Sequence, residues 1–196
     1  MPRQRHTPKV VVKMKSNSLP GFNSPSASTE APLEMLSACH GRVESQCQTL
    51  QRLVAHLGTN GCDQPAQEAA TAVMRYFDTA AKHHHEDEEQ DLFPALLESV
   101  AGSDAVCLKD LIEQLKRDHR ALEDRWRQLR QALLGVLSGN ASQLTADSVT
   151  EFVRAYEAHI AQEENHLLPM AHRLLSEAAL QQVGRAMRER RGIAPI

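Results

Sequence analysis

The sequence carries one polar motif twice, and this repeat limits the possible folds more than any other feature of the chain. The first copy extends from His84 to Pro94 and the second from His159 to Pro169. In each copy a histidine is followed at the fourth position by a glutamate, at the fifth by another glutamate, and at the tenth by a proline. A single His-x-x-x-Glu arises easily by chance, whereas two copies with the same flanking residues indicate two equivalent structural units.

The first copy continues an apolar helical stripe. Val73, Phe77 and Ala80 recur at helical spacing just before the motif. Because positions i and i+4 lie on one face of a helix, His84 and Glu88 are expected to point inward with them. An imidazole and a carboxylate in an apolar interior cost several kcal/mol unless they are paired. A metal ion is a partner that satisfies both groups.

The composition and the apolar spacing both predict helices. Ala, Leu, Gln, Glu and Arg dominate, and aromatic residues make up only 4% of the 196 residues, a balance that favours helix. Apolar residues recur at alternating spacings of three and four, which is typical of bundle helices. We therefore predict an all-α fold, an up-down-up-down four-helix bundle with a short C-terminal helix. The four long helices are expected to begin near Pro32, Pro65, Ser103 and Thr145 or Asp147, and the short one to extend from about Glu177 to Arg188.

Particular residues are expected to end or bend these helices. Gly58 is predicted to end the first helix. Pro94 and Pro169 lack a backbone N–H group, so we expect each to kink its helix just beyond the glutamates of the motif.

The chain is predicted to have three parts. Residues 1–29 contain several prolines and serines, five lysines or arginines and no acidic residue. Such a segment buries too little apolar surface to offset the entropy of ordering it. We expect a disordered basic arm over residues 1–30, the bundle over residues 31–175, and a short amphipathic helix with a tail over residues 176–196.

Charge and composition disfavour several classes of partner. The formal net charge of −3 gives no basic surface for nucleic acid. No apolar run approaches the roughly 18 residues of a membrane span. The four cysteines lack the Cys-x-x-Cys spacing, so free thiols in a reducing cytoplasm are expected.

Inward positions on all four long helices are predicted to meet in one layer. His40 and His119 occupy apolar seam positions in the first and third helices. Counting about 1.5 Å per residue along antiparallel helices brings them near the height of the two motif copies. The predicted metal ligands are His40, His84, Glu88, His119, His159 and Glu163.

This donor set suits a pair of metal ions. Four imidazoles and two carboxylates exceed the needs of one ion and fit two ions about 3.5–4 Å apart, bridged by carboxylates. Nitrogen and oxygen donors without thiolate favour iron or manganese over a structural zinc site, and zinc remains an alternative. A ferritin-like centre needs Glu-x-x-His on two helices, and this spacing occurs only at Glu163 and His166. A hydrogen-bonded network without metal is disfavoured because the apolar seam supplies no partners for six ionisable groups.

These residues together resemble the hemerythrin-like (HHE cation-binding) family, over roughly residues 31–175. The resemblance implies a four-helix bundle with a non-haem di-iron centre. By the same resemblance, His40, His84, His119 and His159 would be terminal ligands, and Glu88 and Glu163 would bridge the irons.

The sequence departs from the oxygen-carrying members in two places. They have a second histidine in the third helix, where this chain has Glu123, and a longer spacing in the fourth helix that would select Glu164. The centre is therefore expected to be poorer in imidazole, which counts against simple reversible oxygen carriage. Other residues could substitute as ligands or orient the imidazoles. These are Glu44, His85, Glu89 and His166.

Two functions follow from the resemblance. The first is a cytoplasmic, non-enzymatic protein whose di-iron centre binds or senses oxygen or nitric oxide, with any output passed to an unknown protein partner. The alternative is a redox protein that removes peroxide or nitric oxide, or one that repairs iron centres.

Overall fold

A computed structural model describes residues 29–100 and 102–193, and all regular structure in this part of the chain is helical. The prediction of an all-α fold is therefore confirmed. The predicted arm lies almost wholly outside the described residues, and its disorder stays a prediction. None of the described helices is both long and apolar enough to cross a membrane. The elements are α1 (Pro32–Asn60), α2 (Gln64–Asp87), η1 (Glu88–Leu92), α3 (Phe93–Ser99), α4 (Ser103–Leu137), α5 (Ala146–Gln162), η2 (Glu163–Leu167), α6 (Leu168–Leu174) and α7 (Glu177–Arg190).

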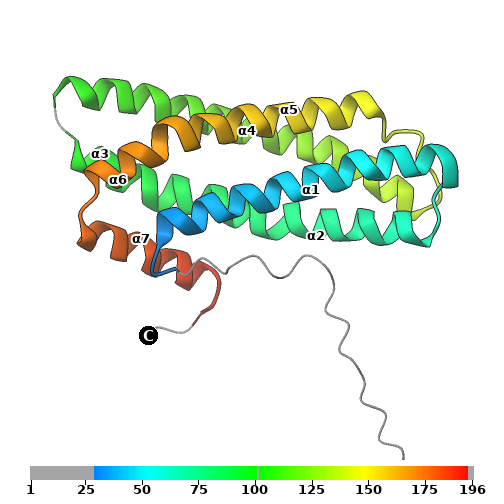
Figure 1. The fold of residues 1–196 in the computed structure, drawn as a ribbon, viewed down its shortest axis with the longest axis horizontal. Helices are drawn as coiled ribbons and strands as arrows, with labels where there is room; N and C mark the ends of the chain where they lie inside the picture. The colour runs from blue at the N-terminus through cyan, green and yellow to red at the C-terminus, as the bar shows by residue number, and fades with distance from the viewer. Residues whose placement is uncertain (1–28, 101, 194–196) are drawn as a thin grey trace, which may run out of the picture.

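The four long helices form an antiparallel bundle (Figure 1). α1 packs beside α2 and α5, and α4 packs beside the same two helices. The chain thus builds two similar halves, α1–α2–η1–α3 and α4–α5–η2–α6. Each half contains one copy of the polar motif, so the sequence repeat corresponds to a repeated structural unit.

Side-chain caps account for several helix starts. The carboxylate of Asp63 accepts a hydrogen bond from the backbone N–H of Ala66 at 3.0 Å, and the hydroxyl of Thr145 accepts one from Ser148 at 3.1 Å. Such caps satisfy N–H groups that have no partner within the helix. α1 continues to Asn60, two residues beyond the predicted end at Gly58, and stops before Gly61, whose φ is +69°.

The irregularities expected at Pro94 and Pro169 lie earlier in the chain than predicted. They are wide π-helical turns, η1 and η2, and each begins at the first glutamate of its motif. The N–H of Phe93 bonds to the carbonyl of Glu88, five residues back. The next residue is proline in both halves and has no N–H to hold the tighter α-helical register. The widening therefore falls on the glutamates themselves.

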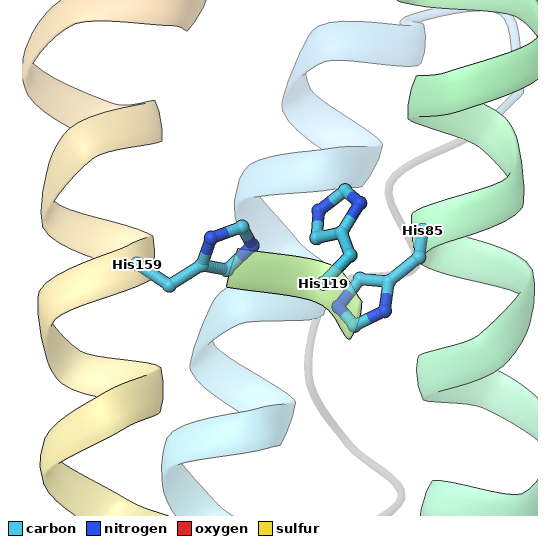
Figure 2. Close-up of side chains that lie close together, drawn as sticks. All are labelled: His85, His119 and His159. Atoms are coloured by element: carbon cyan, nitrogen blue, oxygen red, sulfur yellow. The ribbon is translucent and has the colours of Figure 1, made fainter. Parts of the chain in front are cut away.

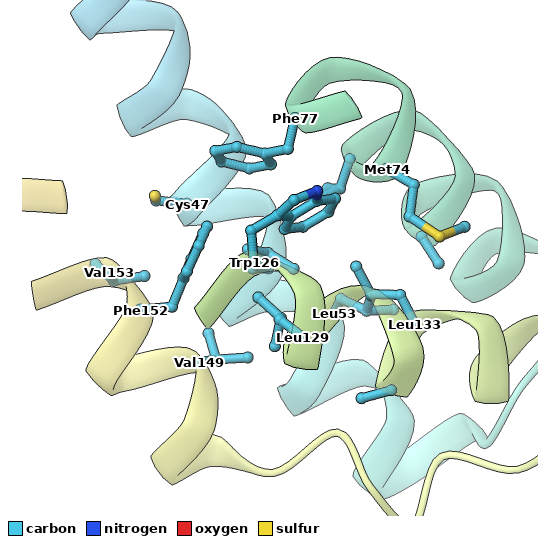
Figure 3. Close-up of a cluster of buried hydrophobic side chains, with 14 of the residues drawn as sticks. Cys47, Leu53, Met74, Phe77, Trp126, Leu129, Leu133, Val149, Phe152 and Val153 are labelled. Carbon is cyan, nitrogen blue, oxygen red and sulfur yellow. The ribbon is translucent and has the colours of Figure 1, made fainter. Parts of the chain in front are cut away.

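Two apolar clusters fill the bundle and leave a polar layer between them. The larger contains Phe77, Trp126 and Phe152 (Figure 3) and fills the end near the α1–α2 connection. The smaller contains Leu36, Phe93 and other residues near α3, α6 and α7. Along α1 the sequence passes from one cluster to the other at His40, and along α2 it does so at His84, so both histidines are enclosed on both sides.

α7 lies along α1 and α2 near the smaller cluster (Figure 1) and holds a buried carboxylate. The side chain of Asp87 is fully buried and forms ion pairs with the guanidinium groups of Arg190 and Arg191. The closest Arg191–Asp87 distance is 2.5 Å, and Arg190 also reaches Asp91 at 2.7 Å. α7 thereby fixes the end of α2 immediately before Glu88.

Removal of both arginines is expected to destabilise the protein strongly. The double variant Arg190→Ala/Arg191→Ala leaves Asp87 buried without a counter-charge, which costs about 3–5 kcal/mol in the free energy of unfolding. Urea unfolding followed by circular dichroism measures this. The exposed Arg185 on the same helix is the matched control, and Arg185→Ala should change stability by less than about 0.5 kcal/mol. In an Asp87→Asn background the double substitution should cost less, and an equal cost in both backgrounds would contradict this account.

Candidate metal centre

Six ionisable side chains meet in the polar layer. Each is at most 4% exposed, and both glutamates are completely buried. They come from α1, α2, η1, α4, α5 and η2, so every long helix contributes. The residues are His40, His84, Glu88, His119, His159 and Glu163.

The first group of potential ligands surrounds one oxygen of each glutamate. Nε2 of His40 lies 2.9 Å from Oε2 of Glu163, and Nε2 of His84 lies 4.0 Å from the same oxygen. Nε2 of His84 is 3.5 Å from Oε1 of Glu88. One ligand atom from each of these four residues can be chosen so that all four atoms lie within 4.8 Å of one another, which is compatible with a single ion.

The second group surrounds the remaining oxygens. Nε2 of His159 lies 3.0 Å from Oε1 of Glu163. Nε2 of His119 lies 3.3 Å from Oε2 of Glu88 and 3.7 Å from Oε1 of Glu163. This group also meets the 4.8 Å limit. Each carboxylate therefore presents one oxygen to each pair of histidines, which is the arrangement that a carboxylate bridge between two ions requires.

The ring orientations within each pair suit metal binding. The planes of His40 and His84 cross at 86°, and those of His119 and His159 cross at 73°. The lone pair of an imidazole nitrogen lies in its ring plane. Steeply crossed planes allow the two lone pairs of each pair to converge on one point.

The hydrogen bonding of the layer tests whether metal ions fit. Within residues 29–100 and 102–193, the buried side-chain nitrogen and oxygen atoms without a hydrogen-bond partner all belong to these six residues and to His85. They include all four oxygens of Glu88 and Glu163 and Nε2 of His40, His119 and His159. Buried polar atoms in native proteins are nearly always partnered. Several of these atoms are in ion-pair contact but make no hydrogen bond, and ligand atoms that face a common space in this way fit bound cations.

The second glutamate of each motif orients a histidine on a neighbouring helix. Oε1 of Glu89 lies 2.7 Å from Nδ1 of His119, and Oε1 of Glu164 lies 2.6 Å from Nδ1 of His40. A carboxylate on Nδ1 fixes the tautomer that leaves the lone pair of Nε2 free for a metal. The hydroxyl of Ser37 donates to Glu164 at 2.7 Å. Ser37 was missed in the sequence, although its position three residues before His40 places it on the same helix face.

Proximity of charges shifts the pKa values of the layer. Burial and the neighbouring Glu163 raise the pKa of Glu88 to about 7. Burial alone would lower the pKa of His40, but the carboxylates of Glu163 and Glu88 outweigh it and raise the value to about 9. The same balance raises the pKa of His119 to about 10. The adjacent histidines in turn hold the pKa of Glu163 well below its usual range, against the effect of burial.

His84 behaves differently from these two histidines. Burial holds its pKa well below the usual range, and the neighbouring histidines add to the effect. His84 is therefore neutral at pH 7, which is the form that binds metal.

Three residues with motif-like spacing are not brought into the layer. Glu44 and Glu123 follow His40 and His119 by four residues, and His166 follows Glu163 by three. All three side chains are exposed, and none belongs to a group that could hold an ion. The shorter spacing in the second copy is the inward one, because Glu163 is fully buried whereas the side chain of Glu164 is 37% exposed.

His85 lies beside the second histidine pair (Figure 2). Its ring stacks on His119 with centroids 4.0 Å apart and planes 13° apart, and it meets His159 at 83°. One nitrogen from each of the three rings falls within 4.8 Å of the others. The stacked planes of His85 and His119 do not intersect near the rings, so their lone pairs cannot reach the same ion without a change of conformation.

Comparison with known proteins agrees with the geometry of the layer. The family profile described as hemerythrin HHE cation binding domain matches residues 31–171. An uncharacterised protein of Haemophilus influenzae is 31% identical over 167 residues, which cover 85% of this chain and 94% of the relative. The match spans all six buried ionisable residues of the layer and most of the chain. The protein therefore belongs to the hemerythrin HHE cation-binding family.

Proposed function

We propose that the polar layer binds two metal ions, each held by one pair of histidines, with Glu88 and Glu163 bridging them. The observation that carries this proposal is the division of the carboxylate oxygens, one of each glutamate facing each pair. His40 and His84 would hold one ion, and His119 and His159 the other.

Iron is the metal that we propose. The donors are imidazole nitrogens and carboxylate oxygens, and among the described residues no cysteine belongs to a group that could hold an ion. Such donors suit iron or manganese better than a structural zinc site. Each subsite offers two nitrogens and two oxygens, so bound iron would supply a redox-active ion with a coordination position open to a small ligand.

The function we propose is the binding or sensing of oxygen or nitric oxide. The protein's part is to hold the donors rigidly, to exclude bulk water through the two apolar clusters, and to orient His40 and His119 through Glu164 and Glu89. A signal would pass to a protein partner. We propose a reducing compartment, the cytoplasm, since all four cysteines are free thiols.

A redox role is the second candidate, and one observation favours it. Glu123, at the position of an additional histidine in oxygen carriers, is exposed and outside the layer. The second subsite thus has only two clearly convergent imidazoles, alongside two carboxylates. Carboxylates stabilise the ferric state, which favours removal of peroxide or nitric oxide over reversible binding.

The optical spectrum of the iron-loaded, fully reduced protein distinguishes the two candidates. Iron is quantified on the same sample, and two irons per chain are expected. Charge-transfer bands that form when oxygen is admitted and disappear when it is removed support binding or sensing. Bands that persist favour the redox candidate, and a protein without iron rules out the proposed centre.

Substitution of single ligands is expected to remove metal. His84→Ala and Glu163→Gln should lower the iron content from about two per chain to about one or less, because each takes away a donor that the surroundings cannot replace. Glu123→Ala is the matched control, since Glu123 has the same spacing from its histidine but is exposed. Metal analysis of folded protein gives the result, and unchanged iron in both ligand variants would contradict the assignment.

Metal affinity is expected to rise with pH. In the metal-free protein the pKa values of His40, His119 and Glu88 are raised to about 9, about 10 and about 7. Each group must lose its proton before it binds a metal, so protons compete with the ions at neutral pH. Calorimetric titration with Mn²⁺ between about pH 6.5 and 8.5 should show affinity increasing by roughly tenfold per unit for each proton displaced. Constant or falling affinity over this interval would contradict the prediction.

A further inference from the structure

One of the positions at which the two halves of the bundle differ lies directly beside the motif histidine. His84 corresponds to His159 in the repeat, so His85 corresponds to Ile160. Each of these residues borders a groove between two helices. The groove between α2 and α4, beside His85, has a volume of about 510 Å³. The groove between α1 and α5, beside Ile160, has a volume of about 130 Å³.

The larger groove extends from the surface to the layer. Its outer part is lined by exposed Lys82 and Glu123, and its inner part by buried His119 and Tyr156. His85 lines it as well. Of the proposed metal ligands, His119 is therefore directly accessible from this groove.

The smaller groove lacks such access. Its lining combines apolar residues such as Val43 and Ile160 with polar ones such as Glu44 and Gln48, and none of the proposed ligands borders it. The two halves are thus equivalent in their proposed ligands but not in the route by which a small molecule could reach them.

His85 stands where the larger groove meets the layer. Its ring covers one face of His119 and lies nearly perpendicular to the ring of His159, with centroids 5.7 Å apart (Figure 2). Its Nε2 atom is buried and has no hydrogen-bond partner. His85 and His119 line the groove together, so a molecule that approaches the second subsite from the groove meets this ring, and the free nitrogen can hydrogen-bond to it.

We propose that the α2–α4 groove is the entrance for the exogenous ligand, a molecule of two or three atoms such as a diatomic gas or azide, and that His85 is the positioning residue at its inner end. The imidazole ring of His85 obstructs the passage, and its Nε2 atom stabilises the ligand once it lies at the His119–His159 subsite. This inference rests on the proposed metal centre.

Azide binding to the iron-loaded, oxidised full-length protein tests the proposal, with stopped-flow absorbance as the readout. His85→Ala removes the ring and should raise the association rate by about tenfold. His85→Phe keeps a ring of similar size but removes the nitrogens, so the association rate should stay near that of the wild type. Loss of one hydrogen bond should then raise the dissociation rate by roughly two- to tenfold. Ile160→Ala, at the equivalent position of the other groove, should leave both rates unchanged.

Iron content separates the possible outcomes. Two irons per chain in all variants, with the rate changes above, support the proposal. Loss of iron in both His85 variants would identify His85 as a ligand and overturn its positioning role. Unchanged rates in His85→Ala, or faster association in Ile160→Ala, would overturn the entrance while leaving the metal centre intact. A wild-type protein that binds no iron overturns the proposed function and this inference together.

Discussion

The structure depends on compensating the negative charge of two carboxylates, Glu88 and Glu163. Both are completely buried in the interior of the bundle. Burial of each charge is costly, and each carboxylate makes ionisation of the other more difficult. In the metal-free protein His40 and His119 supply compensating positive charge, which is why their pKa values are raised. Two bound cations would neutralise the same carboxylates, so protons and metal ions compete for the same buried groups.

Rigid surroundings hold this layer in place. Apolar clusters enclose it on both sides, and their low polarity strengthens each electrostatic contact within it. Two arginines of α7 hold Asp87, which precedes Glu88, while Glu89 and Glu164 hold the rings of His119 and His40. Donors held in this way lose little freedom when an ion binds, and such preorganisation is what a metal site requires.

Much of this arrangement follows from sequence spacing, and the exceptions have physical causes. Alternating apolar residues predict the helices, and the seam positions of His40 and His119 predict that they meet the motif histidines. The repeat spacing favours Glu163, whereas the spacing of oxygen carriers would select Glu164, and only the side-chain directions within the wide turn η2 show which of the two is buried. Nor can it predict the pairing of Asp87 with Arg190, since these residues meet only through the packing of α7.

A repeated unit explains both the symmetry of the layer and the importance of its exceptions. Two similar helix pairs supply two equivalent sets of donors. Equivalent subsites would bind a small ligand equally, whereas a centre that binds one ligand in a defined orientation needs two unequal sides. One half has His85 where the other has Ile160, and this difference between the two sides coincides with the larger groove. The bundle thus combines symmetric donors for two ions with asymmetric access to them.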